Sequence, residues 1–385
     1  MMQYENYFPL GIAKGDAFIG RDEEARWLQR NIEANVHTLL LAPRRYGKSS
    51  LVLHVLEKNK TAFLELDLQL CRSAKSVEKK ILRGVENIIA SAVKDKENIL
   101  QTAKAFFKGS RKEWKIGLKG FVELSIEPDR YDDVAENILT ALQFLDAALA
   151  KEDKKAIIYM DEVQEIIRLE LSSEIQGAIR HFAQKTSRVV FVFSGSNRRM
   201  LRHMFTDNSM PLYQLCDGIT LGKISEKTYV NYLRKVSKKS WKESLSDDII
   251  CEIIRLSERH PRRIYNLCLY LWRLSDISGK HPQLKNVNDA WQKLINSEAK
   301  GIRYSLSKRN TSQLKLLAYI ALDGKSALTG KDAQIATDLS STALSKALQQ
   351  LEENDLVERN EHGVLHIVDP VVRDTLALYE KELIN

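Results

Sequence analysis

The chain has no long hydrophobic run and few cysteines. No stretch of its 385 residues approaches the roughly 18 consecutive apolar residues that a membrane-spanning helix needs. The first 20 residues lack the basic start and apolar core of a secretion signal, so we expect a cytoplasmic protein with no membrane partner. The four cysteines are scattered and form no C-x-x-C pair, which argues against a disulfide framework or a cysteine-rich metal site.

The net charge of +8 is unevenly distributed along the chain. Residues 71–120 contain 13 Lys or Arg against 5 Asp or Glu, and residues 221–300 contain 16 against 9. Basic blocks of this kind can bind the phosphate backbone of double-stranded DNA, but a solvated helix face gives the same pattern. Both interpretations stay open at this point.

The stretch LLLAPRRYGKSS, residues 39–50, carries the strongest functional signal. It predicts a buried strand, a tight loop and the start of a helix, whose N–H groups and dipole can bind the phosphates of a nucleotide. We expect Lys48 to reach the β- and γ-phosphates of ATP, and the Ser49 hydroxyl to bind Mg²⁺. The candidate nucleotide-binding residues of this stretch are Pro43, Arg44, Arg45, Tyr46, Gly47, Lys48, Ser49 and Ser50.

This stretch departs from the G-x-x-x-x-G-K-[ST] pattern at one position, where Ala42 replaces the first glycine. The loop at this position must therefore have room for the Cβ of Ala42, and its backbone must adopt a negative φ. Gly47, where the backbone turns beside the phosphates, is retained. A chance Gly-Lys-Ser loop is the alternative interpretation, and the acidic motif further along the chain argues against it.

That acidic motif is AIIYMDE, residues 156–162, which predicts a buried strand ending in two acidic residues. Asp161 would lie at the carboxyl edge of the sheet, where it can hold Mg²⁺ through its hydration shell. Glu162 would lie beside it and polarise an attacking water. Any strand can end in two acids, but together with the phosphate loop the motif predicts a phosphoryl-transfer site.

The remaining patterns predict helices and two hairpins. Helical spacing continues over residues 76–108 and again over 224–300, whereas residues 114–128 alternate with period two and predict a β-hairpin. From residue 306 we expect three helices and a β-wing, the arrangement of a winged helix-turn-helix. Its recognition helix, residues 341–354, contains two glutamates near its end, so DNA contact and a role in docking a protein or locking the lid both stay open.

Four segments, APRRYGKSS, YMDEVQEI, VFVFSGSNRRM and HPRRIYNL, occur in this order and resemble the AAA+-related P-loop ATPases of the STAND and "archaeal ATPase" group. The resemblance implies an α/β fold with a parallel-sheet core, a helical lid and a C-terminal winged helix-turn-helix. We place the ATPase core at residues 1–222, with an insertion at about 71–130. The lid would occupy 223–303 and the winged helix 304–385.

The resemblance also implies site residues outside the two nucleotide motifs. Phe18, Ile19 and Gly20 match the segment that flanks the adenine base. Arg262 matches the second sensor, which reaches the phosphates from the lid, although the lid motif has Arg where the family has Gly. A third motif at residues 189–197 would sense the γ-phosphate. Its candidate side chains are Ser194, Ser196 and Asn197.

We therefore expect an Mg²⁺-dependent ATPase that changes the relation of core, lid and winged helix according to whether ATP or ADP is bound. Lys48, Glu162 and Arg262 would be its catalytic residues. The alternatives are a DNA-binding regulator with ATP as a slow structural cofactor, and a scaffold without hydrolysis, which the intact Glu162 argues against. Double-stranded DNA, a protein bound by the winged helix and a second copy in a homo-oligomer stay open as partners.

Overall fold

The computed structural model describes residues 4–59, 61–92, 106, 114–119, 123–128, 133–323, 330–359 and 363–384. The chain divides into two compact units. The sheet unit contains residues 23–42 and 51–221, and the helical unit contains residues 1–22, 43–50 and 222–385. Within the described part of the chain, no helix is long and apolar enough to cross a membrane.

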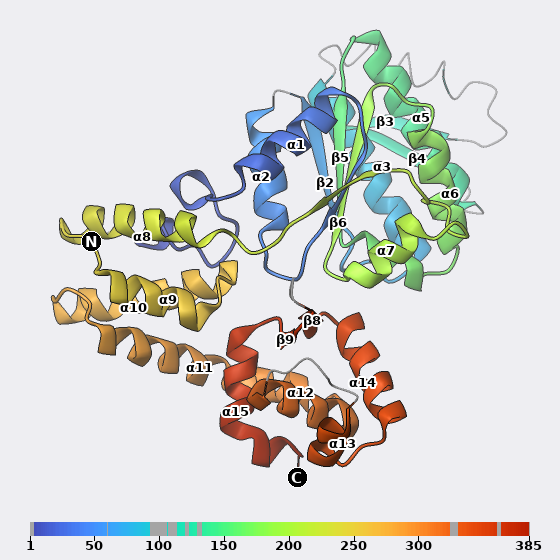
Figure 1. The fold of residues 1–385 in the computed structure, drawn as a ribbon. Coiled ribbons are helices and arrows are strands. Elements are labelled where there is room, and N and C mark those ends of the chain that lie inside the picture. Colours follow the sequence, from blue (N-terminus) through green and yellow to red (C-terminus); the bar gives the residue numbers. More distant parts are fainter. Residues whose placement is uncertain are drawn as a thin grey trace. The chain divides into compact units, whose positions relative to one another are not determined.

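The sheet unit is built on a five-stranded parallel sheet with the strand order β2-β5-β6-β1-β7 (Figure 1). The strands are β1 (Thr38–Leu41), β2 (Ala62–Asp67), β5 (Ala156–Asp161), β6 (Val189–Gly195) and β7 (Asp217–Thr220). The sequences of β5 and β6 are almost continuously apolar because central parallel strands are buried on both faces. Since the strands are parallel, their carboxyl ends meet at one edge of the sheet.

Helices lie on both sides of this sheet (Figure 1). One side carries α3 (Ala74–Ala92), α5 (Val134–Lys151) and α6 (Ser172–Ala183). The other side carries α1 (Asp22–Glu33) and α2 (Lys48–Lys58). A 3-10 helix, η3 (Val163–Arg168), follows β5, and α7 (Arg198–Thr206) follows β6.

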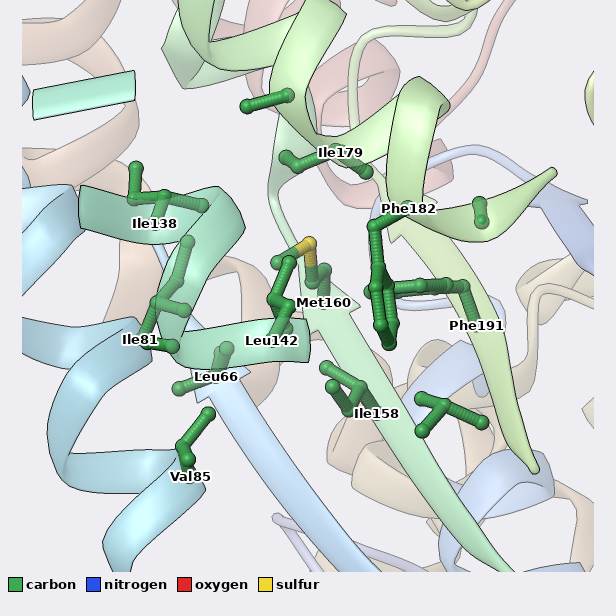
Figure 2. Close-up of a cluster of buried hydrophobic side chains, with 14 of the residues drawn as sticks. Leu66, Ile81, Val85, Ile138, Leu142, Ile158, Met160, Ile179, Phe182 and Phe191 are labelled. Atoms are coloured by element: carbon green, nitrogen blue, oxygen red, sulfur yellow. The ribbon is translucent and has the colours of Figure 1, made fainter. Parts of the chain in front are cut away.

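The core of the sheet unit fills the space between the sheet and α3, α5 and α6. Figure 2 shows side chains of these helices meeting those of β2, β5 and β6. Ile81, Leu142 and Met160 are each at most 1% exposed. Full burial of such a side chain contributes roughly 1.5–3 kcal/mol to stability. The packing therefore fixes the end of β5, where Met160 precedes Asp161.

The insertion contains the predicted hairpin. β3 (Trp114–Lys119) and β4 (Glu123–Pro128) pair in antiparallel register. The helix predicted from residue 76 is confirmed as α3, but nearly all of the continuation to residue 108 lies outside the described residues.

The helical unit begins with two 3-10 turns, η1 (Tyr4–Asn6) and η2 (Gly15–Ala17). The helices predicted over 224–300 are confirmed as α8 (Glu226–Trp241), α9 (Asp247–Ser257), α10 (Pro261–Ser278) and α11 (Leu284–Leu306). Phe8 is fully buried among them and packs its ring edge-on against Trp272. The N-terminal segment is therefore part of the lid core.

The C-terminal part of the helical unit has the three helices and antiparallel hairpin of a winged helix. They are α12 (Thr311–Asp323), α13 (Lys331–Thr337), α14 (Ser341–Glu353), β8 (Val357–Arg359) and β9 (Leu365–Ile367). A further helix, α15 (Pro370–Ile384), follows the wing and is missing from the sequence prediction. The exact domain boundaries given above stay predictions.

Candidate nucleotide-binding site

The phosphate loop connects β1 to α2 and turns through two left-handed residues. They are Arg45, with φ of 65°, and Gly47, with φ of 90°. A Cβ at Gly47 would meet no neighbouring atom, so the backbone conformation rather than the available space requires glycine there. Ala42 is fully buried and is not among the left-handed residues. Its side chain is therefore accommodated where the usual pattern has glycine.

Lys48 and the two serines after it begin α2. The Lys48 side chain is largely buried, and its Nζ donates to the backbone oxygen of Pro43 at 3.3 Å. The ammonium group therefore lies beside the loop instead of extending into solvent. The Ser50 hydroxyl accepts a hydrogen bond from the N–H of Ala13 at 3.0 Å, so Ser50 holds the N-terminal segment. Ser49 remains the loop hydroxyl assigned to the metal.

Arg21 also supports the loop, and the motif analysis missed it. It is 4% exposed, and its Nη2 donates to the backbone oxygens of Tyr46 at 3.3 Å and Gly222 at 2.7 Å. The ring of Tyr46 meets the His260 ring edge-on, with centroids 5.1 Å apart. The loop is thereby attached to the beginning of the lid through both its backbone and a side chain.

The segment predicted to flank adenine lies against the first turn of α8. Ile19 packs on the lid core. Gly20 has φ of 64°, and a Cβ there would lie 2.4 Å from Cγ2 of Ile224 and 3.0 Å from Cγ2 of Thr228. Both the backbone conformation and the close approach therefore require glycine at position 20.

Arg262 is the second residue of α10, the helix that begins at Pro261. Its Nη1 donates to the backbone oxygen of Leu10 at 2.9 Å, whereas its Nε is buried without a hydrogen-bond partner. Burial lowers the pKa of Arg262, and the nearby Arg45 guanidinium lowers it further. The two guanidinium groups, one on the loop and one at the start of α10, repel each other.

His260 caps α10 in its neutral form. Burial lowers the pKa of His260 to about 4, although the Asp369 carboxylate opposes this shift. The neutral Nδ1 can therefore accept a hydrogen bond from the N–H of Arg263, at 3.4 Å.

Arg263, the neighbour of Arg262, is fully engaged inside the helical unit. It is 1% exposed, donates twice to Asp369 at 2.6 Å and once to Glu298 at 2.7 Å. Burial acts to lower the pKa of Arg263, but the two carboxylates outweigh it and raise the pKa. This cluster ties α10 to α11 and to the beginning of α15.

In the sheet unit, the acidic pair lies at the carboxyl edge of the sheet, as predicted. Asp161 is the last residue of β5, and Glu162 follows it with a left-handed φ of 54°. Oδ1 of Asp161 accepts hydrogen bonds from the N–H of Glu162 at 3.0 Å and from the Ser194 hydroxyl. Ser194 is also hydrogen-bonded to the hydroxyl of Tyr159, at 2.9 Å.

Glu162 is oriented by two residues, of which Gln164 is absent from the sequence prediction. Oε2 of Glu162 accepts from Nε2 of Gln164 at 2.5 Å, and from the hydroxyl and N–H of Ser196 at 2.7 and 3.2 Å. A Cβ at Gly195 would lie 1.8 Å from Oε1 of Gln164, so only glycine leaves room for this amide. The one sequence signal for Gln164 is its place two residues after Glu162.

Two of the three polar residues of the third motif therefore hold the acidic pair. Ser194 binds Asp161, and Ser196 binds Glu162. The Asn197 side chain accepts from the N–H of Met200 at 3.0 Å and caps α7. These contacts do not single out one of the three as a γ-phosphate sensor, so that role stays a prediction.

The residues assigned to the metal suit Mg²⁺. Ser49 offers a hydroxyl and Asp161 a carboxylate, which are hard oxygen ligands of the kind that Mg²⁺ prefers. Because the protein supplies only these two ligands, the ion would keep several of its waters. Among the residues that the structure describes, no group of three His, Cys, Asp or Glu could hold another metal ion.

The sheet order, phosphate loop, helical lid and C-terminal winged helix define an α/β P-loop fold of the AAA+ type. The sequence matches no protein-family model and no curated protein. A similar solved structure is the Walker-type ATPase PABY2304 of Pyrococcus abyssi, with a TM-score of 0.69 and 18% identity. The match covers 95% of this chain and 98% of that chain.

The ORC2 protein of Aeropyrum pernix is also similar in structure. Its ADPNP–ADP complexes give a TM-score of 0.57 at 14% identity, covering 99% of this chain and 97% of that chain. Its ADP form gives 0.52 at 12% identity, covering 99% of both chains. At these identities the likeness shows the fold alone.

Proposed function

We propose that the protein is an Mg²⁺-dependent ATPase that acts as a molecular switch. The phosphate loop with its buried Lys48 carries this proposal. The sheet topology supports it, because β6 pairs Gly195 with Leu41 of β1 and Phe193 with Met160 of β5. The chain therefore enters the phosphate loop from the same sheet edge at which β5 ends in the acidic pair. The similar structures are those of a named ATPase and of a protein solved with ADP and ADPNP.

Each residue has a defined task in this proposal. The loop N–H groups and Lys48 bind the phosphates, while Ser49 and Asp161 hold Mg²⁺, which supplies neutralising charge. Glu162 accepts the proton of the attacking water. Since Gln164 and Ser196 both donate to one oxygen of Glu162, they keep the carboxylate in a single orientation.

Phosphate release from ATP, with and without Mg²⁺, tests this function. Mg²⁺-dependent release is expected. A chain that binds no nucleotide contradicts the proposal, whereas binding without hydrolysis would favour the alternative in which ATP is a structural cofactor.

Arg262→Ala tests the switch. We expect this variant to bind ADP almost normally and to lose about 10- to 150-fold in its preference for ATP. The guanidinium would bond the γ-phosphate, which ADP lacks, and a charge-assisted hydrogen bond contributes about 1.5–3 kcal/mol. Titration calorimetry with ADP and a non-hydrolysable ATP analogue measures the preference. Protease protection of residues 224–300 reports the closure of the lid.

Arg273→Ala is the matched control, because Arg273 lies on the same helix and, among the residues that the structure describes, pairs only with Glu5 on the surface, at 3.5 Å. It should behave as wild type. If Arg262→Ala and wild type respond identically to the analogue, Arg262 is only a helix-start residue.

The basic face of α8 supports DNA engagement as a second candidate function. Arg234 pairs with Asp247, and two lysines pair with Asp16. Further exposed cations with no ion pair in the described part of the chain are Lys227, Lys238 and Lys242.

We expect DNA affinity, if α8 carries it, to fall steeply with salt, log K losing about 0.9 per phosphate neutralised on a double-logarithmic plot. Replacing Lys238, Lys239 and Lys242 by Glu should flatten that slope. Fluorescence anisotropy with a labelled duplex at several salt concentrations measures it. Salt-independent binding, or no binding at low salt, would show that these lysines form a solvated helix face with no role in DNA binding.

A further inference from the structure

The helical unit contains a cavity of about 480 Å³ that shares Arg44 and Arg45 with the proposed nucleotide site. Its wall is formed by Arg44 and Arg45 of the phosphate loop, by His260 and Arg263 at the start of α10, by α11, by residues 354–356 before the wing, and by residues 367–369 and Val372 at its end. Lys48, Ser49 and Arg262 do not line it. The cavity thus adjoins the two loop arginines but not the lysine and serine assigned to the phosphates and the metal.

The wall carries an excess of positive charge. Arg44, Arg45 and Arg309 line the cavity, and none has an ion-pair partner within the described ranges. The Nε of Arg309 is buried and makes no hydrogen bond. Burying a guanidinium N–H without a partner is unfavourable, so this group is prepared to receive an acceptor.

The carboxylates on the wall do not balance these charges. Glu298 and Asp369 are both occupied by Arg263. Counted together, the wall carries one positive charge more than negative, with four guanidinium groups, of Arg44, Arg45, Arg263 and Arg309, and three carboxylates, of Glu298, Asp355 and Asp369. An anion entering the cavity therefore meets net attraction.

The other part of the wall is apolar. Ile302 of α11, Leu356 before the wing and Val372 of α15 all line the cavity. A concave site of this size, with an apolar wall and a few converging polar groups, is typical of small-molecule sites.

We propose that this cavity binds a small anionic molecule, whose phosphate or carboxylate groups are held by Arg309 and the loop arginines. The planar guanidinium fork matches both kinds of group through paired hydrogen bonds. The less polar part of the molecule packs against the apolar wall. The site is defined by its own residues and does not depend on ATP hydrolysis.

Binding of inorganic pyrophosphate and of citrate to Lys48→Ala protein tests the site by titration calorimetry. The Lys48→Ala background weakens the proposed phosphate site of the nucleotide, and a difference caused by Arg309→Gln in this background assigns the binding to the cavity. We expect saturable binding with one site per chain for at least one of the two probes. Adding Arg309→Gln should weaken it by about tenfold or more, since one charge-assisted contact is lost.

Lys308→Gln is the matched control, because Lys308 precedes Arg309 but does not line the cavity. Arg44→Gln, at an exposed position, is a second variant that should weaken binding even if Arg309→Gln disturbs folding. Tighter binding of pyrophosphate assigns phosphates to the site, and tighter binding of citrate assigns carboxylates.

Absence of binding by either probe, or equal binding by Arg44→Gln, Arg309→Gln and the Lys308→Gln control, overturns the proposal. If wild type fails to bind ATP while Arg309→Gln still weakens probe binding, the proposed function fails and the cavity site stands.

Discussion

Replacement of Lys48 by alanine is expected to weaken nucleotide binding by about 10²- to 10⁴-fold. Lys48 is 7% exposed, and its Nζ lies 3.3 Å from the backbone oxygen of Pro43, so its positive charge is held beside the loop. Loss of two charge-assisted hydrogen bonds to phosphate, at about 1.5–3 kcal/mol each, corresponds to this factor. Alanine is the best helix former, so α2 itself should be unaffected.

Lys58→Ala is the matched control, because Lys58 is an exposed lysine in the last turn of the same helix. It should bind ATP and ADP as wild type does. Calorimetric titration with both nucleotides measures the difference. Retained affinity in Lys48→Ala would show that the loop is not a phosphate-binding loop.

The sequence predicts those parts of the fold that depend on local patterns. The apolar run before Asp161 indicates a buried strand, and β5 has these bounds to within one residue. The hairpin at residues 114–128 follows from alternation in the same way. α15 was missed, although Asp369 followed by Pro370 is a helix-start signal: Oδ1 of Asp369 accepts the N–H of Val371 at 3.1 Å.

Side chains whose role depends on distant contacts could not be predicted. Arg262 and Arg263 are adjacent and chemically identical, so the sequence alone cannot tell which is buried. The structure distinguishes them, because Asp369, more than a hundred positions later, engages Arg263. Arg21 likewise acts through the backbone oxygens of Tyr46 and Gly222, which no sequence pattern records.

The acidic pair was predicted, but its supporting residues were only partly predicted. Ser196 was singled out as a candidate sensor of the γ-phosphate, and its hydroxyl donates to Glu162 at 2.7 Å, a contact that the sequence did not indicate. This bond requires β6 to end beside the residue that follows β5, which is a property of strand order. The sequence indicates that both strands exist, and the sheet decides that they are neighbours.

The second large effect is expected for Glu162→Gln, which should bind ATP normally and hydrolyse it about 10²- to 10⁴-fold more slowly, the usual contribution of a positioned base. Glutamine has nearly the same shape and can still accept the hydrogen bonds that Glu162 receives from Gln164 and Ser196. It cannot take a proton from water. The substitution therefore keeps the side chain at position 162 in place and removes its ability to act as a base.

Single-turnover hydrolysis with protein in excess, together with the ATP dissociation constant, separates these two properties. Glu165→Gln is the matched control, because Glu165 lies in η3, three residues further on, and pairs with Arg168 at 3.3 Å. The control should keep the wild-type rate. Unchanged turnover in Glu162→Gln would mean that another group orients the water, and Gln164 and Ser196 would then be structural supports of a carboxylate without catalytic function. A slow step that appears only in Glu162→Gln, at unchanged ATP affinity, assigns the base to this carboxylate.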